Sequence, residues 1–287
     1  MANITPQVIP TRYEFLTCLT ENTEWTPDEN GTYRITCIGK SADGGTGGAR
    51  YFYSIKDGSG LSTSENYAGD GGTGGGAGGI SRSIISLKKS DSIHCTINTN
   101  VTSFGEYLSA TAGNGVTPGS GTGGNDFNTT GNTGGYAGKG VKKSTKNGQS
   151  TILQYPSSGG RGGGNGALGG KAGSNTGTNN GSGGGGGGGA TYALPEGIAY
   201  DDPLYTTYIQ RDLSAYSGGN GDNYNDATQP TAGQSYPTFS ALNPVWYGGG
   251  NGGGGDGAFS SSSNIKPGGA GSSGSPGGIL IEKGIFD

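Results

Sequence analysis

Short stretches of alternating apolar and polar residues predict β-strands in the first part of the chain. In the clearest stretch, Tyr33, Ile35 and Cys37 share one face, whereas Arg34 and Thr36 point to the other. A similar pattern at 92–98 places Ile93, Cys95 and Ile97 on a buried face. We also expect strands at 13–20 and 80–87, two short strands within 102–112, and either a strand or a protruding loop at 50–56.

The chain ends on a different pattern. Ile279, Leu280 and Ile281 form a continuous apolar run, which is typical of a strand that is covered on both faces. We expect this C-terminal strand to pair with the early strands and to close the domain. The fold class predicted from these patterns is mainly β and irregular, with short antiparallel strands and essentially no α-helix.

Glycine dominates the segments between these strands. The chain has 67 glycines in 287 residues, including the run Gly183–Gly189 and the stretches 71–79, 159–170 and 248–255. Glycine loses more backbone entropy on folding than other residues, so such runs make poor helices and strands. They are either flexible linkers or extended polyproline II-like helices that hydrogen-bond to neighbouring chains. Several separated runs favour a packed bundle, although their spacing along the chain looks irregular.

Composition excludes several classes of protein. Collagen needs glycine at one-third of positions and much more proline than the 12 found here. Hydrophobic residues make up only 29% of the chain, so backbone hydrogen bonds must supplement the core. Sixteen tyrosines argue against a featureless disordered chain. A net charge of −4 and a pI of about 5.0 disfavour a general binder of nucleic acid or anionic membranes.

Chemistry-bearing residues are few. The three cysteines, Cys18, Cys37 and Cys95, are interpreted as buried free thiols, with a Cys37–Cys95 disulfide as the alternative. The single histidine, His94, has no cysteine or carboxylate cluster near it in sequence. We therefore expect no cofactor, no metal and no catalytic residue. Residues 1–13 lack the pattern of a signal peptide, and no apolar stretch approaches the ~20 residues that span a bilayer.

The best candidates for a binding site lie in an aromatic stretch that is low in glycine, 191–247. Aromatic rings with a polar tip give large contact areas at low entropic cost. The alternative is that the rings pack on the glycine scaffold, which has no side chains of its own. The candidate residues for receptor contact are Tyr192, Tyr200, Tyr205, Tyr208, Tyr216, Tyr224, Tyr236, Trp246 and Tyr247.

A second candidate group is basic. Lys142, Lys143 and Lys146 could bind phosphates of lipopolysaccharide or teichoic acid, although a solvated loop is the favoured interpretation. We divide the chain into four parts on these grounds. They are an N-terminal attachment segment (1–21), a strand-rich part (22–112), a glycine-rich bundle (113–278) with variable loops at 141–158, 191–247 and 259–267, and the closing strand (279–287).

Four separated segments resemble the glycine-rich domain of bacteriophage tail-fibre tips. They are the opening strand that starts at Trp25-Thr-Pro and continues as Gly-Thr-Tyr-Arg-Ile-Thr-Cys-Ile-Gly, the hairpin from Gly78 to Ile97, the segment 102–113, and the closing Pro276-Gly-Gly-Ile-Leu-Ile-Glu-Lys. The resemblance covers about residues 22–287. It implies a virion adhesin at the host-facing end of a tail fibre, in which polyglycine II helices form a packed sandwich and the loops between them bind the receptor.

The resemblance also implies partners and a location. The receptor would be an outer-membrane protein or a surface glycan, the N-terminal region would join the tail-fibre protein, and both a homotrimer and a monomer fit. The protein would be made in the host cytoplasm and act on the virion, without nucleic acid or membrane insertion. Two other functions remain open, namely a structural or ice-binding polyglycine II protein and a tail-associated polysaccharide depolymerase.

Overall fold

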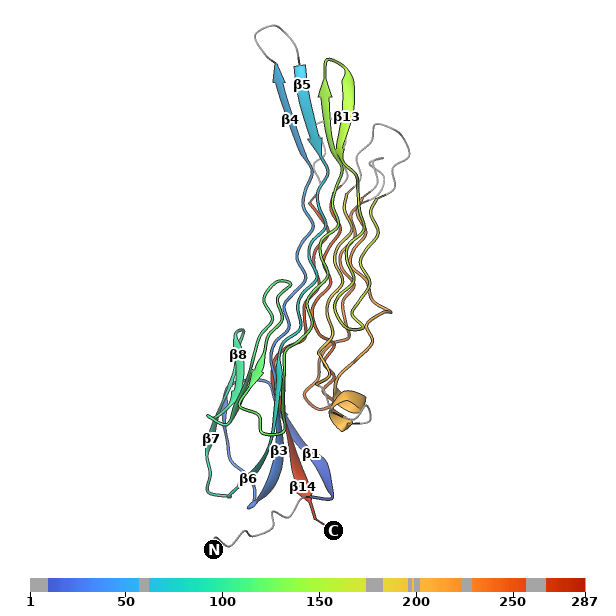
Figure 1. The fold of residues 1–287 in the computed structure, drawn as a ribbon. Helices are drawn as coiled ribbons and strands as arrows, with labels where there is room; N and C mark the ends of the chain where they lie inside the picture. Colours follow the sequence, from blue (N-terminus) through green and yellow to red (C-terminus); the bar gives the residue numbers. More distant parts are fainter. Residues whose placement is uncertain are drawn as a thin grey trace, which may run out of the picture.

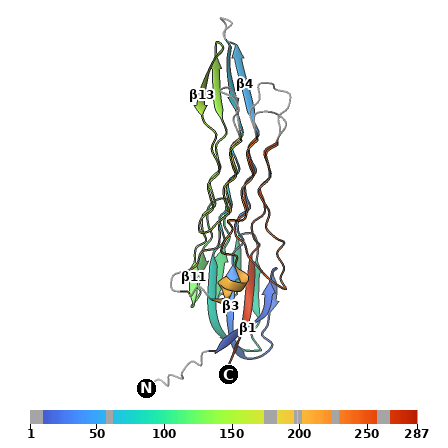
Figure 2. The ribbon, with the colours of Figure 1, turned by 90° about the vertical axis from the view of Figure 1, so that its right-hand side faces the viewer.

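The computed structural model describes residues 10–56, 62–173, 183–195, 198, 202–222, 229–256 and 267–286. The fold is mainly antiparallel β-structure drawn out into a long rod (Figure 1). Two sheets form the base, extended glycine-rich segments form a shaft, and a third sheet forms the distal end. Strands β1 and β14, near the two chain termini, both lie at the base (Figure 2). Within the described residues the one helical element is a short π-helix, η1 (Leu204–Tyr208).

The first basal sheet has the closing strand in its interior. β14 (Gly278–Ile285) pairs with β3 (Gly31–Ile38) on one side and with β1 (Arg12–Leu19) on the other, which confirms that the C-terminal strand closes on the early strands. A register irregularity between Phe15 and Thr17 bulges β1 at Leu16. The sheet continues through β6 (Ile80–Leu87) and β11 (Phe127–Thr129), in the order β1-β14-β3-β6-β11.

The second basal sheet faces the first. Its order is β10-β9-β8-β7-β2, with bounds Gly121–Thr122, Leu108–Thr111, Val101–Phe104, Ile93–Ile97 and Thr23–Trp25. The expectation of a hairpin between 80–87 and 92–98 is wrong, although both strands and the turn between them exist. β6 pairs with β3 and β11, whereas β7 pairs with β8 and β2, so the turn after Leu87 crosses from one sheet to the other.

Both faces of the first basal sheet are covered, which explains the apolar run in β14. Ile279 and Ile281 pack with Tyr33, Ile35 and Cys37 in the cluster between the two sheets, as the alternation predicted. Leu280 lies in a second cluster on the opposite face. That cluster is covered by the aromatic insertion, through Tyr192, Leu204, Tyr205, Ile209 and Trp246. The insertion therefore forms a third layer at the base.

The three cysteines are free and buried, as the first of the two interpretations held. Burial raises the pKa of Cys18 to about 12 and that of Cys95 to about 11, and it also raises the pKa of Cys37 well above its ordinary value. All three thiols are therefore protonated at neutral pH and behave as small apolar side chains.

The shaft consists of extended segments whose backbones bond sideways to other segments. Residues 183–190 lie at its centre, and their hydrogen bonds repeat every three residues. Gly184, Gly187 and Ala190 donate to Gly69, Gly72 and Gly75, over 2.8–3.1 Å. Gly183, Gly185, Gly186 and Gly188 donate to two other segments, at 157–163 and 219–222, and the Gly189 amide donates to the Asn251 side chain. The carbonyls of the same run accept from three segments, at 135–138, 167–173 and 249–255. Six segments thus surround the central run.

The outer segments of the shaft show the same three-residue period in their exposure. In the first of them, Asp43, Thr46 and Ala49 are exposed, and in another Thr133, Tyr136 and Lys139 are exposed. Pro267, Ala270 and Ser273 repeat the pattern in the last segment. The central run, in contrast, is buried at every position. The glycine spacing is therefore ordered, and the impression of irregularity is wrong. The inner run is buried at every position, whereas the outer segments carry an exposed residue at every third position.

The distal sheet contains two hairpins in the order β13-β12-β5-β4. β4 (Tyr51–Lys56) pairs with β5 (Ser62–Tyr67), and β12 (Lys142–Lys146) pairs with β5 and with β13 (Gln149–Gln154). The stretch 50–56 is thus a strand, and most of the expected loop 141–158 is a hairpin. In the described part of the expected loop 191–247, residues 192–209 and 239–246 contribute to the packing at the base, whereas 218–222 and 231–233 are extended segments of the shaft. Residues 259–266 of the third expected loop lie outside the described residues.

Candidate functional site

The distal sheet is the candidate site, because it lies at the end of the rod away from β1 and β14 (Figure 1). It also carries exposed aromatic and basic side chains together. Three neighbouring strands place Tyr51, Tyr67 and Lys142 side by side in one row. The rings of Tyr51 and Tyr67 are 6.0 Å apart, and the Lys142 ammonium lies 4.6 Å from the centre of the Tyr67 ring. This cation–π contact fixes the lysine over the aromatic surface.

Further exposed apolar side chains flank this row. Tyr51 is 60% exposed, and Phe52, on the opposite face of β4, is 41% exposed. On the other edge strand, a register irregularity in the β12–β13 pairing falls at Leu153, which is exposed, and the chain leaves the strand at Tyr155, which is 72% exposed. Large exposed aromatic residues that gather at one end of a molecule favour a contact surface over catalysis.

The three predicted lysines all lie on β12, an inner strand of this sheet, and the favoured interpretation of a solvated loop is wrong in its secondary structure. Lys142 is half-buried on Tyr67, Lys143 is half-buried, and Lys146 is exposed beside the β12–β13 turn. Their role in binding anions stays a prediction.

Three of the predicted receptor-binding aromatic residues are buried at the base. Tyr192 is 4% exposed, and its hydroxyl donates to the Gly39 carbonyl (3.0 Å). The Tyr205 hydroxyl donates to the Ala193 carbonyl, and the Trp246 indole donates to the Pro276 carbonyl, both over 3.0 Å. These contacts match the packing alternative for Tyr192, Tyr205 and Trp246.

The remaining members of that group divide further. Tyr208 is half-buried, with its ring 6.2 Å from that of Phe15 on β1. Tyr216, Tyr236 and Tyr247 are also half-buried and form one ring cluster on the shaft. Tyr200 and Tyr224 lie outside the described residues.

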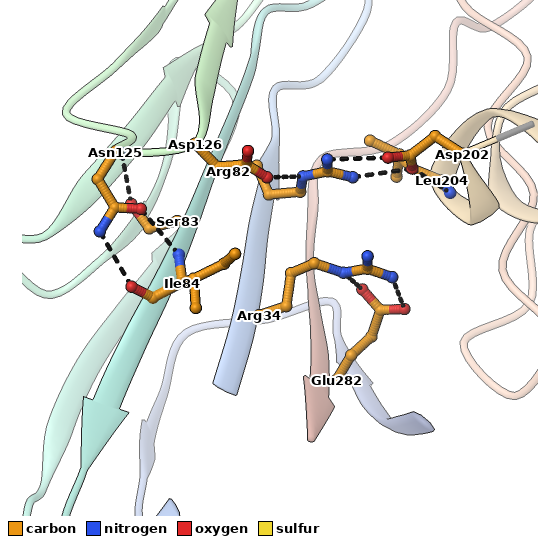
Figure 3. Close-up of polar contacts among 9 residues, drawn as sticks. All are labelled: Arg34, Arg82, Ser83, Ile84, Asn125, Asp126, Asp202, Leu204 and Glu282. Carbon is orange, nitrogen blue, oxygen red and sulfur yellow. Dashed lines mark hydrogen bonds and ion pairs between the residues drawn. The ribbon is translucent and has the colours of Figure 1, made fainter. Parts of the chain in front are cut away.

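An ionic cluster around the buried Arg82 fixes the aromatic insertion to the first basal sheet (Figure 3). The Arg82 guanidinium binds both carboxylate oxygens of Asp202, at 2.8 and 2.9 Å, and one of Asp126 at 2.5 Å. Burial opposes the ionisation of Asp202, but the hydrogen bonds and charge of Arg82 outweigh it and hold the pKa of that carboxyl below its ordinary value. Asp202 is therefore an ionised partner of Arg82 at neutral pH.

A second buried pair lies beside it. Arg34 on β3 binds Glu282 on β14 through two hydrogen bonds of 2.7 Å (Figure 3). The Arg34 guanidinium also stacks 4.3 Å from the centre of the Tyr13 ring. Arg34 does point away from the Tyr33 face, as predicted, but toward this buried pair and not toward solvent. Both arginine sites hold strands and insertion together, and neither offers a free acid or base.

The residues that sequence reasoning missed are Tyr51, Phe52, Tyr136 and Tyr155. Tyr136 is 76% exposed, in the shaft segment between Thr133 and Lys139. The Gly-Gly-X spacing in the sequence could have indicated the exposure of Tyr136, because every third position of an outer segment points to solvent. Tyr51 and Tyr155 could have been recognised as the residues that begin and end the two distal hairpins.

Within the described ranges, no group of three or more histidine, cysteine or acidic residues is arranged to hold a metal ion. No described helix is both long and apolar enough to cross a bilayer. Neither a protein-family model nor a curated protein matches the chain.

Proposed function

We propose that this protein is a bacteriophage tail-fibre tip adhesin, which binds a receptor on the bacterial surface through its distal sheet and involves no chemistry. The observation that carries the proposal is the polarity of the rod. β1 and β14 lie at one end, and the exposed aromatic and basic side chains of the distal sheet lie at the other (Figure 2). A rod of this kind can be anchored by its base and present its far end to a surface.

The proposal includes the nature of the shaft, which we assign as a bundle of polyglycine II helices. Support comes from the three-residue repeat in both hydrogen bonding and exposure, since this helix has three residues per turn. Because such a helix makes no internal hydrogen bonds, its amides must be satisfied by neighbours. Six neighbouring segments around residues 183–190 supply those partners within one chain, which also supports a monomeric working form over a trimer.

The remaining partners follow from this orientation. The base would join the tail-fibre protein through the N-terminal region, so the virion is the expected location. An outer-membrane protein and a surface glycan both remain candidate receptors. The mixture of aromatic rings and lysines on the distal sheet suits either of them.

Binding to bacterial cells tests the proposal. The purified protein carries its label on a terminal tag, so that no lysine is modified. It is incubated with a panel of bacterial strains, and we expect it to bind a subset of them. Replacing both Tyr51 and Tyr155 by alanine should weaken that binding at least tenfold, about 1.4 kcal/mol, because two exposed ring contacts are removed. Cell-bound label measured by flow cytometry gives the result.

The matched control is Tyr136→Ala, which removes an equally exposed tyrosine from the shaft. It should bind cells as the parent does, and all variants should melt at the parent temperature. The proposal fails if no strain is bound, or if the distal double variant binds as well as the Tyr136 variant.

A further inference from the structure

A pocket of about 260 Å³ opens on the side of the shaft near its base. Its walls come from two segments that are distant in sequence, 235–247 in the aromatic insertion and 273–276 just before β14. The insertion contributes the rings of Tyr236, Phe239 and Tyr247. The pocket shares no residue with the distal sheet, so it is a separate site.

The aromatic wall of this pocket is held rigidly. The rings of Tyr236 and Tyr247 stack in parallel, with centroids 5.3 Å apart and planes 8° apart. Tyr216 meets Tyr236 edge-on at 4.9 Å, and the Tyr236 hydroxyl donates to the Gly249 carbonyl over 2.8 Å. Because these contacts are made within the protein itself, binding would cost little ordering of the rings.

The opposite wall is fixed as well. The buried Ser275 hydroxyl oxygen accepts hydrogen bonds from the amides of Tyr247 (2.8 Å) and Gly248 (3.0 Å), which ties the two walls together. The Pro276 carbonyl is held by the Trp246 indole. The pocket is thus a built feature of the fold and not a gap between loose loops.

The lining chemistry narrows the class of ligand. The lining contains no charged side chain, and its polar groups are the hydroxyls of Ser235, Thr238, Ser273 and Ser275 beside the tyrosines. An unpaired phosphate or carboxylate would be desolvated here without a counter-charge. The pocket offers aromatic rings bordered by hydroxyls. It therefore suits a ligand ring that has weakly positive C–H groups on one side and hydroxyls at its rim.

Size narrows the class further. Pockets for drug-sized ligands span ~300–1,000 Å³, and this one lies below that range. We propose that the Tyr236–Tyr247 pocket binds a single neutral sugar ring, such as one hexose unit of a surface polysaccharide. This site lies at the opposite end from the distal sheet, so its existence is independent of receptor binding there.

Saturation-transfer NMR on the full-length protein tests this site. The probes are methyl glucoside, methyl galactoside and methyl N-acetylglucosaminide at millimolar concentration, with glucuronate and glucose 6-phosphate as charged comparators. At least one neutral glycoside should receive saturation, and the charged probes should not. Tyr247→Ala should weaken that binding at least tenfold, because it removes one ring of the stacked pair.

A second variant covers the case in which Tyr247→Ala perturbs folding. Ser273→Trp adds an indole at an exposed position in the pocket wall and should abolish saturation transfer without removing a packed ring. Tyr136→Ala, an exposed position of the shaft outside both sites, should leave sugar binding unchanged. The proposal is overturned if no neutral glycoside receives saturation, if only the charged probes do, or if both pocket variants bind like the parent.

Discussion

Replacing Gly188 by alanine is expected to cost at least about 3 kcal/mol of unfolding free energy, the upper end of the range for overpacked cores. A Cβ at this position would lie 1.9 Å from the carbonyl oxygen of Ala167. That obstacle is backbone, and the Ala167 amide is itself bonded to the Gly189 carbonyl at 2.9 Å, so it cannot move aside freely. The melting temperature, followed by circular dichroism, should fall by roughly 6–12 °C.

Gly31→Ala is the matched control for this prediction. A Cβ on Gly31 would meet only the ring of Tyr33, at 3.5 Å or more, which is ordinary van der Waals contact. We expect its effect to stay within about 1 kcal/mol. If Gly188→Ala melts within a degree or two of Gly31→Ala, the close approach of the shaft backbones is refuted.

Replacing Arg82 by alanine is expected to destabilise the protein by about 3 kcal/mol, the lower end of the cost of removing one partner from a buried ion pair, because Arg82 is buried whereas Asp202 is half-buried and Asp126 is exposed. The change would leave the carboxylates of Asp126 and Asp202 without their arginine partner. It would also remove the guanidinium that stacks 4.5 Å from the centre of the Phe127 ring. Since Asp202 lies just before η1, the aromatic insertion should also loosen from the first basal sheet. Urea unfolding at pH 7 measures the loss.

An acid series serves as the control for that assignment. The pKa of Asp202 is lowered in the folded state, so its contribution is complete above its ordinary pKa of about 3.9 and is lost as the pH falls through the folded-state value. Asp202→Asn should therefore flatten the fall in stability below about pH 4. If stability falls with pH in the same way for the parent and for Asp202→Asn, the ion pair between Arg82 and Asp202 does not account for the loss of stability in acid.

The strands could be predicted because each carries its own signal. Alternation in β3 and β7 marked their buried faces, and the apolar run in β14 marked a strand covered twice. Sheet membership could not be predicted, because whether β6 pairs with β7 or passes to another sheet depends on partners that local pattern does not name. The same limit applied to Arg34, whose partner Glu282 lies 248 residues away.

The candidate site was harder to predict, for a physical reason. A tyrosine can supply a binding surface or fill a core, and composition does not distinguish the two. Tyr192 and Tyr205 cover the apolar side chains, such as Leu280, on the outer face of the first basal sheet. Tyr136, in contrast, stands at the outward third position of a shaft segment, and its exposure could have been read from its spacing to Thr133 and Lys139.

The shaft explains how so glycine-rich a chain can be rigid. In the central run, successive glycines meet different neighbours: Gly186 faces Gly252, Gly187 faces Gly135, and Gly188 faces Ala167, each with a carbonyl oxygen within 2.2 Å of the Cβ that glycine lacks. A side chain would therefore clash in every direction. Only outer segments, which have one open side, carry a side chain at every third position.

The central claim is that mutual backbone hydrogen bonds take the place of a hydrophobic core in the shaft. Amide-resolved hydrogen exchange along Gly183–Gly189 tests this claim most directly. We predict that the Gly184, Gly186 and Gly187 amides exchange only through global unfolding, as slowly as the amides of β3 between its sheet neighbours. Exchange of these glycines at the rate of an unstructured peptide, while β3 stays protected, would contradict the account.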